Sequence, residues 1–317
     1  MKAVAAAVVL IAAASLQRGW NAGPPLSVGR SEVAVATVGG ALYVIGGYAN
    51  GNVDQTLVQK FTPDVRDDRL GGKWQDVAPL PRGLNHVGAL GYHGKIYTFG
   101  GFAAQNNSAV PDANVYDPKA DRWTPVAPLP RPLGSVSVAL FNDEIHLVGG
   151  RDVHSVATHL MYDARANRYI VRAPLPVGRD HMGLVEFNGK LYAVGGRIDT
   201  PARNTAYVDV YDNKTDRWTA AAPLPAPRSG MAVAVFTQRI WAMGGEQAGM
   251  SSAFSTVFAY DDRRNCWMPF GVLPEGRHGT GAAVIGDLLY VPAGAPVPGG
   301  SRQSDSLFVF RPMTIGR

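Results

Sequence analysis

The stretch Tyr192-Ala193-Val194-Gly195-Gly196 joins a short apolar strand to a pair of glycines, and the same pattern returns along the chain. Four further copies begin at Tyr43, Tyr97, His146 and Trp241, and a sixth, Tyr290-Val291-Pro292-Ala293-Gly294, has lost the first glycine. Successive copies begin 46 to 54 residues apart. A period near 50 residues, with several short strands in each unit, predicts a β-propeller.

A second set of residues repeats in phase with the glycine pairs. Tyr-Asp pairs are followed, seven residues after the tyrosine, by an aromatic residue, which is Trp123, Tyr169, Trp218 or Trp267. In the first unit Phe61 precedes Trp74 by thirteen residues, which indicates a longer turn. The glycine pair, the Tyr-Asp and the spaced aromatic together resemble the kelch repeat. The resemblance covers nearly all of residues 16–317 and implies an all-β, six-bladed kelch-type propeller with four antiparallel strands per blade.

The fourth unit shows how each blade divides into strands. We expect strands over residues 182–187, 190–194, 206–211 and 217–222, with Asn188-Gly189 as a two-residue hairpin turn. The last unit ends at Phe310 with no outer strand after it, whereas Trp20 precedes the first unit. The N-terminal segment is therefore predicted to be the outer strand of blade 6, which closes the ring.

The first residues resemble a secretory leader. Lys2 precedes an apolar stretch, residues 3–16, that contains small residues at 12–15. Fourteen residues fall short of the roughly 20 that span a bilayer. We therefore expect a signal peptide over 1–15, a propeller over 16–317, a secreted or periplasmic location and no membrane insertion after cleavage. An uncleaved anchor is the alternative.

Composition excludes several other classes of protein. The 37 glycines and 23 prolines argue against a helical bundle, and a hydrophobic content of 46% is enough for a large core. The net charge of +5 is not gathered into a basic run, so we expect no nucleic-acid partner. Cys266 is the single cysteine and lies beside Trp267 on a predicted outer strand, which argues against a redox or metal role. We expect a monomer.

One mouth of the channel is the predicted ligand face. Because the two inner strands of a blade are antiparallel, the connections between blades and the loops after the glycine pairs meet at the same end. An arginine occurs at each connection between blades, at positions 30, 82, 131, 179, 228 and 277. These arginines either brace the blades or bind an anionic ligand. The loops after the glycine pairs vary from blade to blade and are polar, as binding loops often are.

The ligand is expected to be an anionic or glycan small molecule, with a protein partner as the other possibility. The candidate binding residues are Arg30, His86, Arg151, Arg179, His181, Arg197, Asp199, Arg228, Glu246 and Arg277. Glu32 and His181 stand just inside the mouth and are candidates for an acid and a base; hydrogen-bonded loop-end residues are the alternative interpretation. We expect no cofactor and no metal, because His86 and His181 lack the spacing of a metal motif.

Resemblance to particular kelch proteins suggests three functions. A binding module is the primary expectation. Exported kelch proteins that act as sialic-acid mutarotases are similar in layout, and that activity would use Arg179, Arg197, Glu32 and His181, although the long insertion of that group is missing. Galactose-oxidase-like copper chemistry is rejected, because it would need a cysteine cross-linked to a tyrosine near two histidine ligands, whereas Cys266 lies on a predicted outer strand. Ubiquitin-adaptor kelch proteins are disfavoured by the leader.

Overall fold

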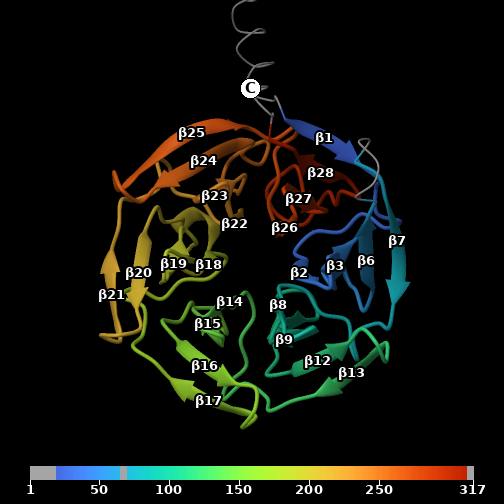
Figure 1. Cartoon of the computed structure of the whole chain (residues 1–317), viewed down its shortest axis with the longest axis horizontal. Helices are drawn as coiled ribbons and strands as arrows, with labels where there is room; N and C mark the ends of the chain where they lie inside the picture. The colour runs from blue at the N-terminus through green and yellow to red at the C-terminus, as the bar shows by residue number, and fades with distance from the viewer. Residues whose placement is uncertain (1–18, 65–69, 313–317) are drawn as a thin grey trace, which may run out of the picture.

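Six four-stranded antiparallel sheets stand like blades around a central channel (Figure 1). This computed structural model describes residues 19–64 and 70–312. The predicted signal peptide lies outside the described residues. The all-β, six-bladed architecture with four strands per blade is thereby confirmed.

The strands run from the channel to the rim in each blade, except that blade 6 takes its outer strand from the N-terminal segment. Blade 1 consists of β2 (Ala34–Val38), β3 (Ala41–Ile45), β6 (Val58–Pro63) and β7 (Gly72–Val77). Blade 2 consists of β8 (Gly88–Tyr92), β9 (Lys95–Phe99), β12 (Ala113–Asp117) and β13 (Arg122–Pro125). Blade 3 consists of β14 (Ser137–Phe141), β15 (Glu144–Val148), β16 (His159–Asp163) and β17 (Arg168–Val171). Blade 4 consists of β18 (Gly183–Phe187), β19 (Lys190–Val194), β20 (Val208–Asp212) and β21 (Arg217–Ala220). Blade 5 consists of β22 (Ala232–Phe236), β23 (Arg239–Met243), β24 (Thr256–Asp261) and β25 (Cys266–Val272). Blade 6 consists of β26 (Ala283–Ile285), β27 (Leu288–Pro292), β28 (Leu307–Phe310) and β1 (Trp20–Gly23).

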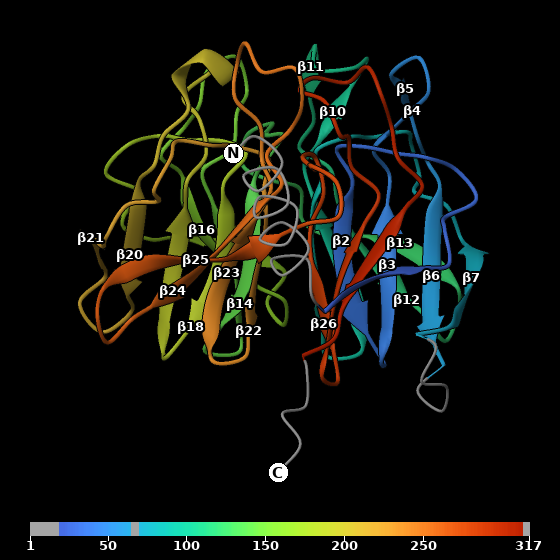
Figure 2. The ribbon, with the colours of Figure 1, turned by 90° about the horizontal axis from the view of Figure 1, so that it is seen from above.

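The two faces of the ring differ. One face carries the tight turns between the first two strands of each blade, and the other, the loop face, carries the longer connections (Figure 2). Two small hairpins rise from the loop face, namely β4 (Tyr48–Ala49) with β5 (Val53–Asp54) and β10 (Phe102–Ala103) with β11 (Ser108–Ala109), and a 3₁₀ turn, η1 (Pro201–Arg203), follows β19. No helix among the described residues is long and apolar enough to cross a membrane.

The predicted closure of the ring is confirmed. β1 pairs antiparallel with β28, so that Trp20 lies opposite Phe310 and their ring centroids are 5.1 Å apart. Leu26, just after β1, is buried, and its N–H donates to the carbonyl of Asp305 at 2.7 Å. The first described segment thus completes the blade made by the last strands.

The spaced aromatic residues join each blade to the one before it. The indole N–H of Trp218 donates to the carbonyl of Ala173, and Trp123 and Trp267 make the same kind of bond to Ala78 and Ala222. These bonds lie between outer strands of successive blades, which explains why the aromatic residue repeats with the blade period.

The glycine pairs are required by both backbone conformation and space. Gly46 and Gly47 have φ values of +59° and +92°, and a Cβ on Gly46 would lie 2.5 Å from the carbonyl oxygen of Leu84 in the next blade. Side chains larger than hydrogen would therefore push neighbouring blades apart. In blade 6 Ala293 takes the first position with φ +57°, a conformation that an alanine adopts only at a cost.

Candidate functional site

The chain turns into the channel at one equivalent position in every blade. All six residues there have a left-handed backbone: Glu32 (φ 54°), His86 (52°), Ser135 (52°), His181 (54°), Gly230 (64°) and Gly279 (62°). We call these residues the axial ring.

Backbone hydrogen bonds link the axial ring from blade to blade. The N–H of His86 donates to the carbonyl of Glu32 at 3.0 Å, and that of Ser135 donates to the carbonyl of His86 at 2.9 Å. In the same way, the N–H of Gly230 donates to the carbonyl of His181, and the N–H of Gly279 donates to the carbonyl of Gly230. At the junction of blades 3 and 4 the hydroxyl of Ser137 donates to the carbonyl of Met182 at 2.7 Å.

Four members of the axial ring carry a side chain in spite of their positive φ. A left-handed backbone is uncommon for residues other than glycine, and it is found disproportionately at functional sites. Three of the four, Glu32, His86 and His181, are ionisable and buried. The ring therefore holds reactive side chains at a position where glycine would be less strained.

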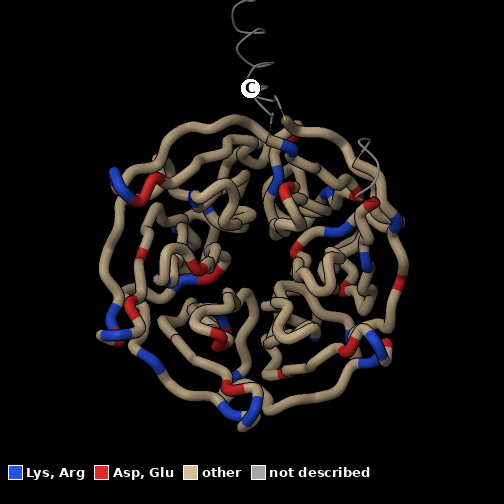
Figure 3. Tube along the Cα trace, viewed as in Figure 1, with Lys and Arg blue, Asp and Glu red and all other residues tan. Residues whose placement is uncertain are grey.

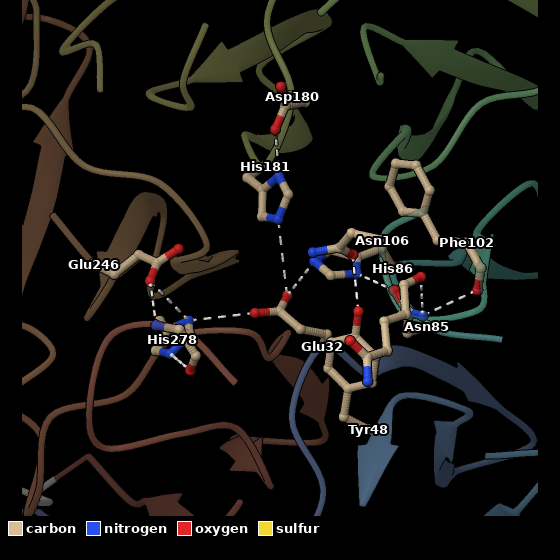
Figure 4. Close-up of polar contacts among 12 residues, drawn as sticks. Glu32, Tyr48, Asn85, His86, Phe102, Asn106, Asp180, His181, Glu246 and His278 are labelled. Carbon is tan, nitrogen blue, oxygen red and sulfur yellow. Dashed lines mark hydrogen bonds and ion pairs between the residues drawn. The ribbon is translucent and has the colours of Figure 1, made fainter. Parts of the chain in front are cut away.

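Glu32 lies among three histidines (Figure 4). Its Oε2 is 3.0 Å from Nε2 of His86 and 4.0 Å from Nε2 of His181. Its Oε1 is 3.4 Å from Nδ1 of His278. The four side chains come from blades 1, 2, 4 and 6, so residues far apart in the sequence meet near the axis.

The hydrogen-bond network places a proton on Nδ1 of His86. The amide nitrogen of Asn85 faces three acceptors, namely a carboxylate oxygen of Asp54 and the carbonyls of Phe102 and Gln105. The amide oxygen of Asn85 is therefore the atom that faces Nδ1 of His86, and Nδ1 is the donor. The Nε2 of His86 points toward Glu32 (Figure 4).

The same reasoning applies to His181. Its Nδ1 donates to a carboxylate oxygen of Asp180, and its Nε2 accepts from Nη2 of Arg197 at 2.8 Å. A guanidinium can only donate, so Nε2 of His181 carries a lone pair and the ring is neutral. Burial and the charge of Arg197 lower the pKa of His181 to about 4, in agreement with this assignment.

The other two groups of the cluster are ionised. Burial opposes ionisation of Glu32, but the neighbouring His86 and His278 outweigh it and hold the pKa of Glu32 well below its usual range. Burial also lowers the pKa of His278, but the carboxylates of Glu32 and Glu246 outweigh that effect and raise its pKa to about 9. The Nε2 of His278 donates to the carbonyl of Val297 at 2.7 Å.

A cavity of about 390 Å³ opens above this cluster on the loop face. It is lined by Glu32, Tyr48, His86, Asn106, Asn107, Arg151, Arg197, Asp199, Thr200, Pro201, Glu246, Gly299 and Gly300. Many charged residues of the described chain also lie at the outer edges of the blades (Figure 3). The volume lies within the range of small-molecule sites.

Below the cluster the channel is largely apolar. Val35, Ala89, Val138, Leu184 and Val233 line it toward the opposite face, where its volume is about 430 Å³. Glu32 and His86 border both the upper cavity and the channel beneath it. The polar cluster therefore forms the floor of the loop-face cavity.

The two arginines of the cavity differ in their partners. Arg197 donates to Asp180 through Nε and to Glu246 through Nη1, at 3.1 and 2.7 Å. Arg151 lies with its guanidinium carbon 4.8 Å from the ring centroid of Phe102. It makes no side-chain hydrogen bond or ion pair to any described residue, and its Nε is buried without a partner. Arg151 is thus available to an anion.

Four junction arginines proposed as ligand contacts lie elsewhere. Arg30, Arg179, Arg228 and Arg277 are buried, with exposed fractions of 0 to 1%. Arg30 donates to the carbonyls of Gly46 and Leu57, and Arg179 to that of Gly195 and to Asp209. Arg228 and Arg277 bond likewise within their blades. The four brace their blades, so we exclude them from the candidate site.

The remaining sequence candidates fall at the cavity. His86, Arg151, His181, Arg197, Asp199 and Glu246 line it or its floor. Neither Asn85 nor His278 was among the candidate site residues that the sequence predicted. The signal that could have found both is their place directly before axial positions, which Asp180 shares.

Comparisons with known proteins agree with this architecture. The family model of the Kelch motif matches residues 29–81, 84–130, 178–225 and 227–271. The chain is 35% identical over 103 residues to Kelch-like protein terF of Aspergillus terreus, a stretch that spans 29% of this chain and 20% of that protein. It is 34% identical over 111 residues to F-box/kelch-repeat protein At1g16250 of Arabidopsis thaliana, a stretch that spans 34% of this chain and 27% of that protein. The match therefore covers less than a third of either relative.

A solved structure shares the fold over nearly its whole length. The structure of YjhT matches with a TM-score of 0.77 and 17% sequence identity, covering 89% of this chain and 95% of that chain. At this level of identity the likeness concerns the fold alone.

Proposed function

The chain belongs to the kelch-repeat family, and on that premise we propose that it is a binding protein whose loop-face cavity takes a small carboxylate-bearing sugar. Kelch propellers are generally interaction modules, and the fold by itself does not select a ligand. The selection comes from the side chains that the loops bring to the cavity.

The unpartnered guanidinium of Arg151 is the observation that carries this proposal. A cation that is partly buried and unpaired is costly unless a ligand neutralises it. Its planar fork fits a carboxylate with two parallel hydrogen bonds, and the ring of Phe102 holds the plane in place. The other cavity arginine, Arg197, already has two carboxylate partners.

The rest of the lining suits a polyhydroxylated body. Tyr48 donates to the side-chain oxygen of Asn106 at 2.9 Å, and Asn107 and Asp199 add an amide and a carboxylate at the same cavity. Sugar hydroxyls donate and accept, so they pair with both kinds of group. The aromatic side chain of Tyr48 also lines the cavity.

Thermal-shift and calorimetric titrations with sialic acid, glucuronate and galacturonate, beside their neutral counterparts, test the proposal. The acids should bind more tightly, and their affinity should fall as salt rises. Arg151→Ala should weaken binding by about 1.5–3 kcal/mol, and Arg151→Lys should recover part of the loss. Arg131→Ala is the matched control, since Arg131 is half-exposed and pairs with Asp152 on the same face. Equal binding by wild type and Arg151→Ala would refute the proposal.

A second candidate function is isomerisation of such a sugar. It is favoured by Glu32 and His86, which lie 3.0 Å apart at the floor of the cavity and could exchange a proton with a bound ligand. Exchange between the anomers of a bound acid, followed by NMR, separates a catalyst from a binding protein. Catalysis should then be lost in Glu32→Gln.

We also propose that the protein acts as a monomer outside the cytoplasm. Residues 1–16 support export by their leader-like sequence, although they lie outside the described residues. Sedimentation of the mature chain tests the oligomeric state.

A further inference from the structure

The three ionisable side chains of the axial ring present their polar atoms to one another. Glu32, His86 and His181 each offer one oxygen or nitrogen, and all three atoms lie within 4.8 Å of one another. In a tetrahedral zinc site with bonds of about 2.0–2.1 Å, ligand atoms are roughly 3.3 Å apart. The separations from Glu32 Oε2, which are 3.0 Å to His86 and 4.0 Å to His181, bracket that value.

A hydrogen bond at Nδ1 orients the ring of each histidine. Nδ1 of His86 donates to Asn85, and Nδ1 of His181 donates to Asp180, so each Nε2 points toward Glu32. Metal-bound histidines nearly always donate their other ring N–H to an amide, carboxylate or carbonyl oxygen, which fixes the tautomer. His86 and His181 are thus oriented in the way that histidine ligands are oriented in metal sites.

We propose that Glu32, His86 and His181 bind a divalent transition metal, with Zn²⁺ as the best fit. Two imidazoles and one carboxylate form a common zinc ligand set that leaves a fourth position open. All three residues line the channel beneath the cluster, and Glu32 and His86 also line the loop-face cavity, so the open position could be reached from either side. A ligand oxygen or a water molecule would complete the coordination.

One existing contact must be given up. Nη2 of Arg197 donates to Nε2 of His181 at 2.8 Å, where the metal would approach. The guanidinium can withdraw this one donor and keep its bonds to Asp180 and Glu246. Those two carboxylates would continue to balance its charge beside the metal.

This inference reverses the expectation of no metal that chain spacing suggested. His86 and His181 are 95 residues apart in the sequence, so a search for closely spaced ligands passes over them. The propeller brings equivalent positions of different blades to one axis, where their ring centroids are 4.6 Å apart.

Titration of chelator-treated full-length protein with Zn²⁺ alone tests the site. Calorimetry should give one equivalent, and Co²⁺ in its place should show the intense absorption of a tetrahedral site. His86→Gln and Glu32→Gln should each weaken binding at least about tenfold, since loss of even an outer partner costs that much. His93→Gln should bind as the wild type does, because His93 is exposed and lies in the turn between β8 and β9, on the face opposite the loop face. Cys266→Ser should also bind as the wild type does.

X-ray absorption by the zinc-loaded wild type decides the question even if an axial variant does not fold. A spectrum with two imidazoles per zinc supports the site, and one without imidazole overturns it, as does binding that survives both axial substitutions. Arg151→Ala should leave zinc affinity unchanged, which separates failure of this proposal from failure of the proposed sugar ligand.

Discussion

The hydroxyl of Tyr169 donates to the carbonyl of Ala127 at 2.8 Å, which is the bond that an indole makes in neighbouring blades. Trp218, for example, donates to Ala173 at the same distance. The change from tryptophan to tyrosine in blade 3 therefore preserves the link between blades. The repeat is defined at this position by a hydrogen-bond donor on a large ring.

Removing that donor should weaken the ring. Tyr169→Phe leaves the carbonyl of Ala127 without its partner and should lower the free energy of unfolding by about 1 kcal/mol. Urea denaturation measures the change. Tyr207→Phe is the matched control, because Tyr207 is 50% exposed, and it should be within about 0.5 kcal/mol of wild type. Equal losses in both variants would contradict the assigned role.

Closure of the ring makes a second prediction. A chain that begins at Ser27 lacks β1 and the buried Leu26, and it leaves β28 as an open edge. We expect it to lose on the order of 3–6 kcal/mol, since two large apolar side chains leave the interior. A chain that begins at Gly19 is the control for shortening. Equal melting temperatures for the two chains would show that the closing strand contributes nothing to stability.

Two buried histidines make stability depend on pH. In blade 3 Nδ1 of His159 donates to Ala173, and its Nε2 accepts from Nδ1 of His146 at 2.9 Å. Burial, and for His146 the neighbouring His159, lower the pKa values to about 4 for His159 and about 3 for His146. The neutral forms favour folding, so this stability is complete above about pH 6.5 and is lost as pH falls through about 4 and 3.

Denaturation at a series of pH values should therefore show a loss on the order of a few kcal/mol between pH 6.5 and 4. His159→Gln should flatten that slope, whereas the exposed His93→Gln should keep it. The same slope in both variants would assign the acid sensitivity to other groups.

The strain of the axial ring is also measurable. Ser135 has φ 52°, and its buried hydroxyl has no hydrogen-bond partner. Glycine relieves the backbone and removes the unpaired group, so Ser135→Gly should stabilise the protein by about 1 kcal/mol. Ser137→Gly, two residues later, should destabilise it, because the Ser137 hydroxyl bonds to Met182. A lower melting temperature for Ser135→Gly would show that the serine is needed for packing.

The predicted export has a direct test. If residues 1–15 form a signal peptide, the native protein should begin after Ala14 or Ser15 and leave the cytoplasm. Mass spectrometry of protein recovered from each fraction measures this. A chain in the cytosol that still carries Lys2 would count against export.

The blades could be predicted because their determinants are local. The glycine pair at Gly195-Gly196 and the Asn188-Gly189 turn need positive φ values that few other residues accept. Even Thr237-Gln238, which departs from the turn pattern, adopts the same left-handed turn. Closure by Trp20 followed from counting strands.

The site could be predicted only in part. Position along the repeat placed Glu32, His86 and His181 at the mouth, but it gave no distance between them. It also could not tell where an arginine points. Arg179 turns inward to carbonyls of its own blade, whereas Arg151 stays beside the cavity, and that difference depends on the packing of neighbouring loops.

Outside the junction of blades 3 and 4, the axial ring is joined through backbone atoms, and those bonds do not depend on which side chains the ring carries. The N–H of His86 and the carbonyl of Glu32 would form the same bond under other residues, and Gly230 and Gly279 already do so without any side chain. Recognition and folding are therefore specified by different atoms of the same residues. A lineage of such propellers can exchange its axial chemistry one blade at a time while the architecture is inherited unchanged.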